Sequence, residues 1–102
     1  MADAALVRDG STLRLSGPVT LNTVTPLTAQ GRELLLELPA AATLDLSRVT
    51  RVDSAGVAML VEFWRLRERL GRGLEFASIP TELRPLLQLY DLEDMFVPGV
   101  AR

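Results

Sequence analysis

The sequence predicts an α/β domain in which a mixed β-sheet carries its helices on one face. Three strand-like segments alternate with three helical segments along the chain, and this order is typical of helices packed on a sheet. Three helices are enough to cover one face of such a sheet but not both. The chain has 102 residues, which is the size of one domain, so residues 1–102 are predicted to form a single domain.

The composition is that of a globular protein and excludes several classes of function. Hydrophobic residues make up 48% of the chain, charged residues make up 24%, and the net charge is −2. This balance gives no electrostatic basis for binding nucleic acid or an anionic membrane surface. Cysteine and histidine are absent, which removes thiolate zinc sites and the commonest general base and metal ligand. We therefore expect no metal site and no cofactor.

No apolar run approaches the length of about 18 residues that a membrane-spanning helix needs. The start, "MADAALVRDG", lacks the basic and apolar regions of a secretory signal. These two features predict a cytosolic protein that does not insert directly into a membrane.

Strand patterns account for the first part of each predicted strand–helix unit. "TLRLSG", residues 12–17, alternates apolar and polar residues and ends at Gly17-Pro18, and "ALVRDGST" before it has the turn signal Asp9-Gly10. "ATLDLS", residues 42–47, alternates in the same way, and "LEFASI", residues 74–79, reads as the last strand. We expect each of these segments to bury one face.

Helical patterns follow the strands. Apolar residues between positions 20 and 38 recur at helical spacing, with Pro39 beyond the end. The main helix is predicted from Ser54 to Leu70, and a short helix follows Pro80-Thr81 through "ELRPLLQLYDL". The segment "EDMFVPGVAR", residues 93–102, is predicted to be a tail.

The stretch "VDSAG" at the start of the main helix has a structural and a functional interpretation. Asp53 or Ser54 could cap the helix by accepting a hydrogen bond from a free N–H of its first turn, a contact worth about 1 kcal/mol. Asp53 also places a negative charge at the positive end of the helix. In the functional interpretation, Ser54 is a nucleophile, a phosphorylation site or a contact with a partner protein.

Catalysis by Ser54 is disfavoured by the absence of a base. A serine nucleophile needs a base within hydrogen-bond reach, and this chain has no histidine. All eleven basic residues are arginine, which does not lose its proton in proteins. "DSAG" also differs from the Gly-x-Ser-x-Gly pattern of serine hydrolases. We therefore predict that the protein is not an enzyme.

The main helix has an apolar arc that is wider than contact with one sheet requires. One side carries Val57, Leu60, Val61 and Trp64, and Trp64 is predicted to be largely buried; a second side carries Met59, Phe63, Leu66 and Leu70. Part of this arc is expected to contact a neighbouring helix. The remaining face carries Ser54, Ala58, Glu62, Arg65 and Arg69. Small Ala55 and Ala58 beside the Ser54 hydroxyl would let another protein approach closely.

The stretch "TLDLSRVTRVDSAGVAMLVEF" resembles the signature of the STAS domain family, in which a strand leads to Asp-Ser/Thr-x-Gly at a helix start. The resemblance extends over nearly the whole chain, since "LRLSGPVTLNTVTPL" is similar to the opening strand and first helix of the family. "LDLSRVTRVDSAG" is similar to the motif of the small cytosolic STAS subunit of Mla-type phospholipid-transport ABC systems. "LLQLYDL", residues 86–92, resembles the closing helix of that subunit.

The resemblance implies a non-catalytic subunit that binds and regulates the ATPase of a Mla-type ABC transporter. The partner-binding residues would then be Ser54, Ala55, Ala58, Met59 and Glu62, within a complex that includes a membrane permease. Such a subunit would be cytoplasmic and held at the inner membrane through its partners. The alternative implied by the same motif is an anti-sigma factor antagonist whose partner is an anti-sigma factor kinase. In that class the serine matching Ser54 is phosphorylated, and the modification adds about −1.5 to −2 charge beside Asp53.

Overall fold

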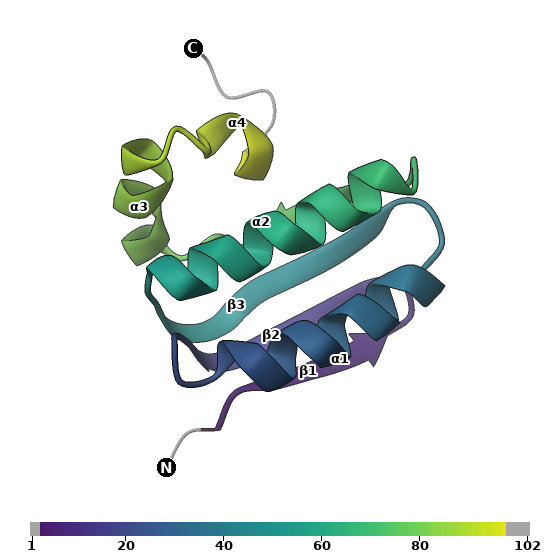
Figure 1. The fold of residues 1–102 in the computed structure, drawn as a ribbon, viewed down its shortest axis with the longest axis horizontal. Coiled ribbons are helices and arrows are strands. Elements are labelled where there is room, and N and C mark those ends of the chain that lie inside the picture. The colour runs from purple at the N-terminus through teal and green to yellow at the C-terminus, as the bar shows by residue number, and fades with distance from the viewer. Residues whose placement is uncertain (1–2, 98–102) are drawn as a thin grey trace.

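Four strands form one mixed sheet in the computed structural model, which describes residues 3–97 (Figure 1). The strands are β1 (Ala5–Asp9), β2 (Thr12–Val19), β3 (Ala42–Val52) and β4 (Leu74–Ala77). They lie in the order β1-β2-β3-β4. β1 is antiparallel to β2, whereas β2 with β3 and β3 with β4 are parallel. The parallel pairs are each connected through a helix, as parallel strands require.

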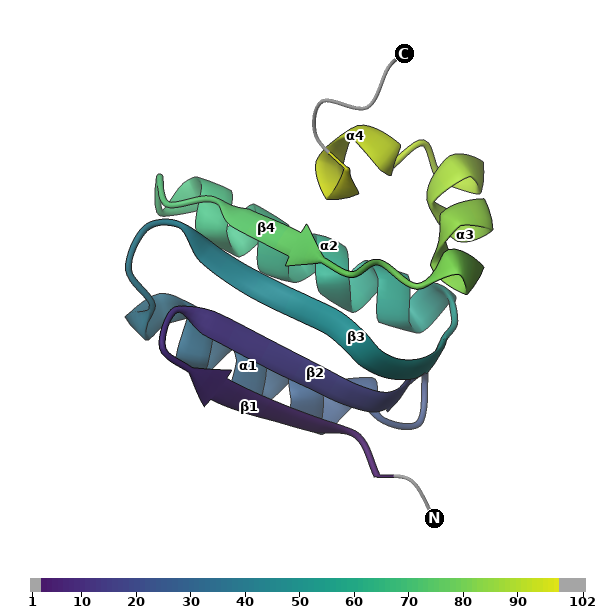
Figure 2. The ribbon, with the colours of Figure 1, turned by 180° about the vertical axis from the view of Figure 1, so that it is seen from behind.

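Helices cover one face of this sheet. They are α1 (Val24–Glu37), α2 (Ser54–Arg69), α3 (Arg84–Leu89) and α4 (Glu93–Phe96), with a 3₁₀ turn η1 (Thr81–Leu83) before α3. α1 and α2 lie side by side on the sheet, and within residues 3–97 no helix lies in front of its other face (Figure 2). The short helices α3 and α4 lie beyond the β4 edge. The predicted fold class, a mixed sheet with helices on one face, is confirmed.

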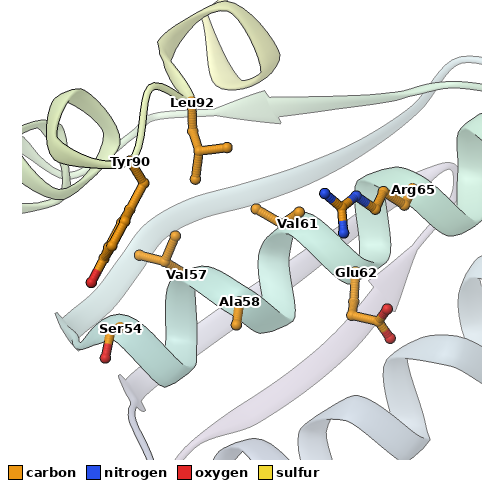
Figure 3. A pocket seen from close by; sticks show the side chains of 8 residues that line it. All are labelled: Ser54, Val57, Ala58, Val61, Glu62, Arg65, Tyr90 and Leu92. Carbon is orange, nitrogen blue, oxygen red and sulfur yellow. The ribbon is translucent and has the colours of Figure 1, made fainter.

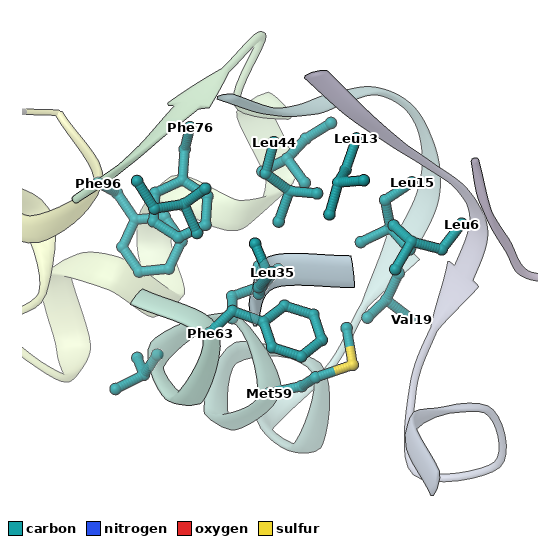
Figure 4. Close-up of a cluster of buried hydrophobic side chains, with 14 of the residues drawn as sticks. Leu6, Leu13, Leu15, Val19, Leu35, Leu44, Met59, Phe63, Phe76 and Phe96 are labelled. Atoms are coloured by element: carbon teal, nitrogen blue, oxygen red, sulfur yellow. The ribbon is translucent and has the colours of Figure 1, made fainter. Parts of the chain in front are cut away.

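The core lies between the sheet and the two long helices (Figure 4). Leu13, Leu15 and Leu44 of the sheet and Phe63 of α2 are fully buried there. α1 and α2 approach closely because Gly31 lies opposite Phe63. A Cβ at position 31 would overlap the Phe63 ring, so the missing side chain makes room for an aromatic ring between the helices.

β3 is longer than the alternating pattern of residues 42–47 indicates. It continues to Val52 and therefore leads directly into Asp53. The pairing of β2 with β3 shifts register between Arg14 and Ser16 and again between Gly17 and Pro18. Each shift places an extra β3 residue opposite β2, which interrupts the alternation of buried and exposed side chains. This interruption explains why the second half of the strand does not have a simple strand pattern.

The predicted tail begins with a helix instead. Residues Glu93–Phe96 form α4, and Phe96 is almost fully buried. The rings of Phe96 and Phe76 stack with their centroids 4.2 Å apart and their planes 17° apart. Burial of the Phe96 ring against β4 therefore holds in place a helix that is only about one turn long. Residues 98–102 of the predicted tail lie outside the described residues.

The burial of two α2 side chains depends on contacts that the helical pattern does not report. Trp64, predicted to be largely buried, is only partly buried and packs against the edge of the core. Arg67, three residues later, is fully buried. Arg67 can be buried because the carbonyl oxygens of Leu35 and Leu38, at the C-terminal end of α1, accept hydrogen bonds from its guanidinium group.

Candidate partner-binding site

Asp53 lies between the end of β3 and the start of α2, and it is the N-cap of that helix. Its Oδ1 accepts a hydrogen bond from the Gly56 N–H over 3.0 Å, and its Oδ2 accepts one from the Leu21 N–H over 3.0 Å. The Leu21 bond is the main cause that holds the pKa of Asp53 below its ordinary value, with the Gly56 bond as a further cause. Asp53 is therefore the residue that caps the helix, and the Ser54 hydroxyl is not used for this purpose.

A close backbone contact explains why the Asp-Ser-Ala-Gly stretch ends in glycine at position 56. It lies in the first turn of α2, and a Cβ at this position would overlap the carbonyl oxygen of Val19 at the end of β2. Because the obstacle is backbone, a side chain could not be accommodated by a rotamer change. The glycine lets the helix start lie directly against β2, and this contact fixes the position of Ser54 on the surface.

An open groove with a volume of about 440 Å³ runs along the outer side of α2. Its lining residues from α2 are Ser54, Val57, Ala58, Val61, Glu62 and Arg65, and those from the segment after α3 are Tyr90 and Leu92. Val57 and Val61 are buried and form the floor, whereas Ser54 and Ala58 are exposed. Figure 3 shows the Tyr90 ring extending towards the N-terminal end of α2, where Ser54 lies. The groove is thus apolar at its floor and has the hydroxyl groups of Ser54 and Tyr90 at its end.

Two charged side chains border the groove. The Glu62 carboxylate is turned towards α1 and pairs with Arg32 at 3.4 Å, with both side chains about half exposed. Arg65 extends along the rim (Figure 3). An exposed ion pair of this kind contributes little to stability, roughly 0–1 kcal/mol. Glu62 and Arg65 therefore remain available to orient a partner by charge.

The structure brings together three of the five residues predicted to bind a partner. Ser54, Ala58 and Glu62 are exposed and line the groove. Ala55 is half-buried and is not among the lining residues. The prediction that Met59 binds a partner is wrong, because Met59 is only 3% exposed and points into the core. It lies one position beyond the exposed face, where the helical period turns its side chain towards the sheet.

Sequence reasoning missed part of the groove. The helical pattern places Val57 and Val61 on the apolar arc, and no pattern in the sequence connects Tyr90 or Leu92 with Ser54. The signal that was present is the width of the apolar arc on α2. Part of that arc faces the groove under the segment after α3. This segment covers α2 incompletely and leaves an open groove above the buried valines.

The site has the features of a binding surface. Within residues 3–97, no group of three or more acidic side chains is placed to hold a metal ion. In the same range, no helix is both long enough and apolar enough to cross a membrane. The groove offers apolar contact, the hydroxyl groups of Ser54 and Tyr90, and two charged side chains, and groups of this kind can recognise another molecule by shape and charge.

The chain matches a known family of proteins. A family model described as "Mlab, STAS domain" matches residues 3–98. The chain therefore belongs to the STAS domain family, as the motif around Ser54 predicts.

Among curated proteins, the chain is similar to the intermembrane phospholipid transport system binding protein MlaB of Escherichia coli (strain K12). The two are 29% identical over 92 residues, which are 90% of this chain and 92% of the relative. The MlaB protein of Shigella flexneri matches to the same extent.

Solved structures share the fold at lower sequence identity. The anti-sigma factor antagonist SpoIIAA in its unphosphorylated form matches with a TM-score of 0.64 and 15% identity, over 84% of this chain and 82% of the other. The phosphorylated form of the Bacillus protein matches with a TM-score of 0.68 and 15% identity, over 92% and 88%. A sulfate transporter family protein from Wolinella succinogenes matches with a TM-score of 0.65 and 20% identity, over 86% and 73%. At these identities the similarity concerns the fold alone.

Proposed function

We propose that this protein is a non-catalytic cytoplasmic subunit of a Mla-type phospholipid-transport ABC system and that it binds the ATPase subunit through the groove beside Ser54. It would be held at the inner membrane through this ATPase and the membrane permease. The observation that carries the proposal is the open groove itself, which combines a buried valine floor with exposed Ser54 and Ala58. The similarity to MlaB over 90% of the chain supports the choice of transport system.

The dimensions and chemistry of the groove favour a protein segment as its occupant. Its apolar floor follows the axis of α2 from Val57 to Val61, and small Ala58 lies beside it. A helix of a partner could lay an apolar face along such a groove, which is a common mode of recognition. Exposed Glu62 and Arg65 at the rim would set its orientation, because charges at an interface mainly control specificity.

The antagonist alternative is second to this proposal. Its support is the similarity of fold to SpoIIAA, at 15% identity. The exposed Ser54 hydroxyl is compatible with phosphorylation, but an exposed serine is equally useful as a contact. The MlaB similarity is higher in identity, 29% against 15%, and this difference supports placing the transport hypothesis first.

Replacement of small groove residues tests the proposal. Ala58→Arg places a long charged side chain over the valine floor, and we expect it to abolish capture of the ATPase subunit in a pull-down from cells that coexpress both proteins. Ser54→Glu should have the same effect, and it should fold well because a helix start tolerates negative charge. The transport activity of the assembled complex should fall with both variants.

Arg84→Ala is the matched control for these variants. Arg84 is exposed at the start of α3 and does not line the groove, so binding should be unchanged. Circular dichroism melting of each variant separates loss of binding from loss of folding. Folded Ala58→Arg and Ser54→Glu proteins that still capture the ATPase with parental affinity would refute the proposed site.

A further inference from the structure

Asp53 connects two surface segments that are far apart in the sequence. One carboxylate oxygen accepts from the Gly56 N–H of α2, and the other accepts from the Leu21 N–H, at 3.0 Å each. Leu21 belongs to the turn formed by residues 20–23 between β2 and α1. Figure 1 shows this turn and the start of α2 at the same end of the molecule. One side chain therefore sets the position of the turn relative to Ser54.

Leu21 is conspicuous for its exposure. Its side chain is 72% exposed, and Tyr90, at the end of α3, is 48% exposed. In Figures 1 and 2, α3 and the turn lie on opposite sides of the α2 start. Tyr90 lines the groove beside Ser54, and the Leu21 amide is bonded to Asp53, the residue before Ser54. Large exposed apolar residues close to a groove commonly mark a binding site.

The turn that carries Leu21 has a fixed backbone. The Thr23 hydroxyl donates to the Pro18 carbonyl oxygen over 2.8 Å and accepts from the Thr20 N–H over 2.9 Å. The Asp53 bond then holds Leu21 itself from the side of α2. A leucine presented on ordered backbone loses little conformational freedom when a partner covers it, which favours binding.

We infer that Asp53 is a positioning residue of the partner-binding surface and that Leu21 is a contact residue on it. The inference rests on the proposed function, and the occupant is the same ATPase subunit. The proposed surface is continuous, because Ser54 follows Asp53 directly in the chain and the Leu21 amide donates a hydrogen bond to Asp53. Both Asp53 oxygens already accept hydrogen bonds within the chain, so the role assigned to Asp53 is to hold Leu21 and the helix start in position.

The test is a double-mutant cycle with purified protein and the ATPase subunit, measured by isothermal titration calorimetry. Leu21→Ala should weaken binding about fivefold, the effect of truncating one apolar contact. Asp53→Ser should also weaken binding while it keeps the helix cap, because serine caps helices as well as aspartate does but is too short to serve both amides. The double variant should bind within about twofold of Leu21→Ala, because the two residues act as one unit.

A second measurement follows the turn directly. Hydrogen exchange at the Leu21 amide should become faster in Asp53→Ser, while amides in the middle of α2 keep their protection. Leu36→Ala is the matched control, since Leu36 is 51% exposed at the far end of α1 and should bind like the parent.

The outcomes separate this inference from the proposed function. Parental affinity of Leu21→Ala, together with loss of binding by Ala58→Arg, would overturn the inference and leave the proposed function standing. An Asp53→Ser effect of full size in the Leu21→Ala background would show that Asp53 contacts the partner itself, which also overturns the inference. If Ala58→Arg binds normally, the proposed function fails first.

Discussion

Arg67 Nη1 donates a hydrogen bond of 2.7 Å to the carbonyl oxygen of Leu38, at the C-terminal end of α1. The same guanidinium also bonds the carbonyl oxygens of Leu35, Pro39 and Gly73. A side chain of α2 thus caps the end of α1 and the start of β4 with one planar group. Burial lowers the pKa of Arg67, and the dipoles of these four carbonyl groups balance its charge.

We predict that Arg67→Lys lowers the free energy of unfolding by about 2–4 kcal/mol. An ammonium group cannot reach acceptors that lie around a planar fork, and buried carbonyls without a donor cost about 1–3 kcal/mol each. Urea unfolding followed by Trp64 fluorescence measures the change. Arg65→Lys is the control, because Arg65 is exposed on the same helix. The free energy of unfolding of this variant should change by less than about 0.5 kcal/mol. Equal stability of the two variants would contradict the capping role of Arg67.

Gly56→Ala should destabilise the protein although alanine is the better helix former. Propensity alone would add about 1 kcal/mol, but the new Cβ would overlap the Val19 carbonyl oxygen. The start of α2 must then move away from β2, and we expect a net loss of about 2 kcal/mol or more. Ala29→Gly at an exposed position of α1 should lose about 1 kcal/mol from propensity alone. A thermal melt of Gly56→Ala above the parental midpoint would show that the helix start is not held against β2.

Phe96→Ala tests whether α4 is part of the folded domain. Phe96 is buried and stacks on Phe76, so removal of its ring should cost about 3–5 kcal/mol, as for other buried aromatic residues. Leu89→Ala is the control, since Leu89 is 73% exposed and should change stability by less than about 0.5 kcal/mol. Denaturant midpoints of both variants give the comparison. A Phe96→Ala protein as stable as the parent would return residues 93–96 to the role of a tail.

Stability should fall at acid pH because of Asp53 and Asp45. Hydrogen bonds from the Leu21 and Gly56 amides lower the pKa of Asp53, and bonds from Ser47 lower that of Asp45. The folded state therefore binds protons less tightly than the unfolded chain. The resulting contribution to stability is fully present above the ordinary carboxyl pKa of 3.8. It is lost as the pH falls through the lower pKa values of the folded state.

The urea midpoint measured from pH 6 to pH 2.5 checks this prediction. The parent should lose more stability over the range than a variant carrying both Asp53→Asn and Asp45→Asn, which has no carboxylate to protonate at either position. Parallel curves for the two proteins would mean that neither carboxylate contributes to the acid dependence.

Much of the fold follows from local patterns in the sequence. The alternation in residues 12–17 and 42–47 and the helical spacing in residues 54–70 predicted elements that the structure contains, because the side-chain period of an element is set by its own backbone. The Asp-Ser-Ala-Gly stretch predicted a capped helix start and the STAS family. The continuation of β3 to Val52 was not predicted, since two register shifts against β2 remove the alternation.

The candidate site was predicted only in part, for a related reason. The exposed positions of Ser54, Ala58 and Glu62 follow from the period of α2 alone. The period could not exclude Met59, which lies at the border of the exposed face, and the position of the sheet decides that it is buried. Tyr90 and Leu21 reach the start of α2 from segments more than 30 residues away in the chain, and no local pattern reports such a contact.

The sequence by itself determined the order of the elements, the exposed serine at the start of α2 and membership of the STAS family, because each depends on neighbouring residues. Only the tertiary structure decided what lies opposite each side chain. Arg67 is buried because the end of α1 offers carbonyl oxygens there, and Phe96 is buried because Phe76 lies within stacking distance. The groove above the buried valines stays open because the segment after α3 covers α2 incompletely. These contacts join distant segments, so they depend on the assembled fold and not on the period of any one element.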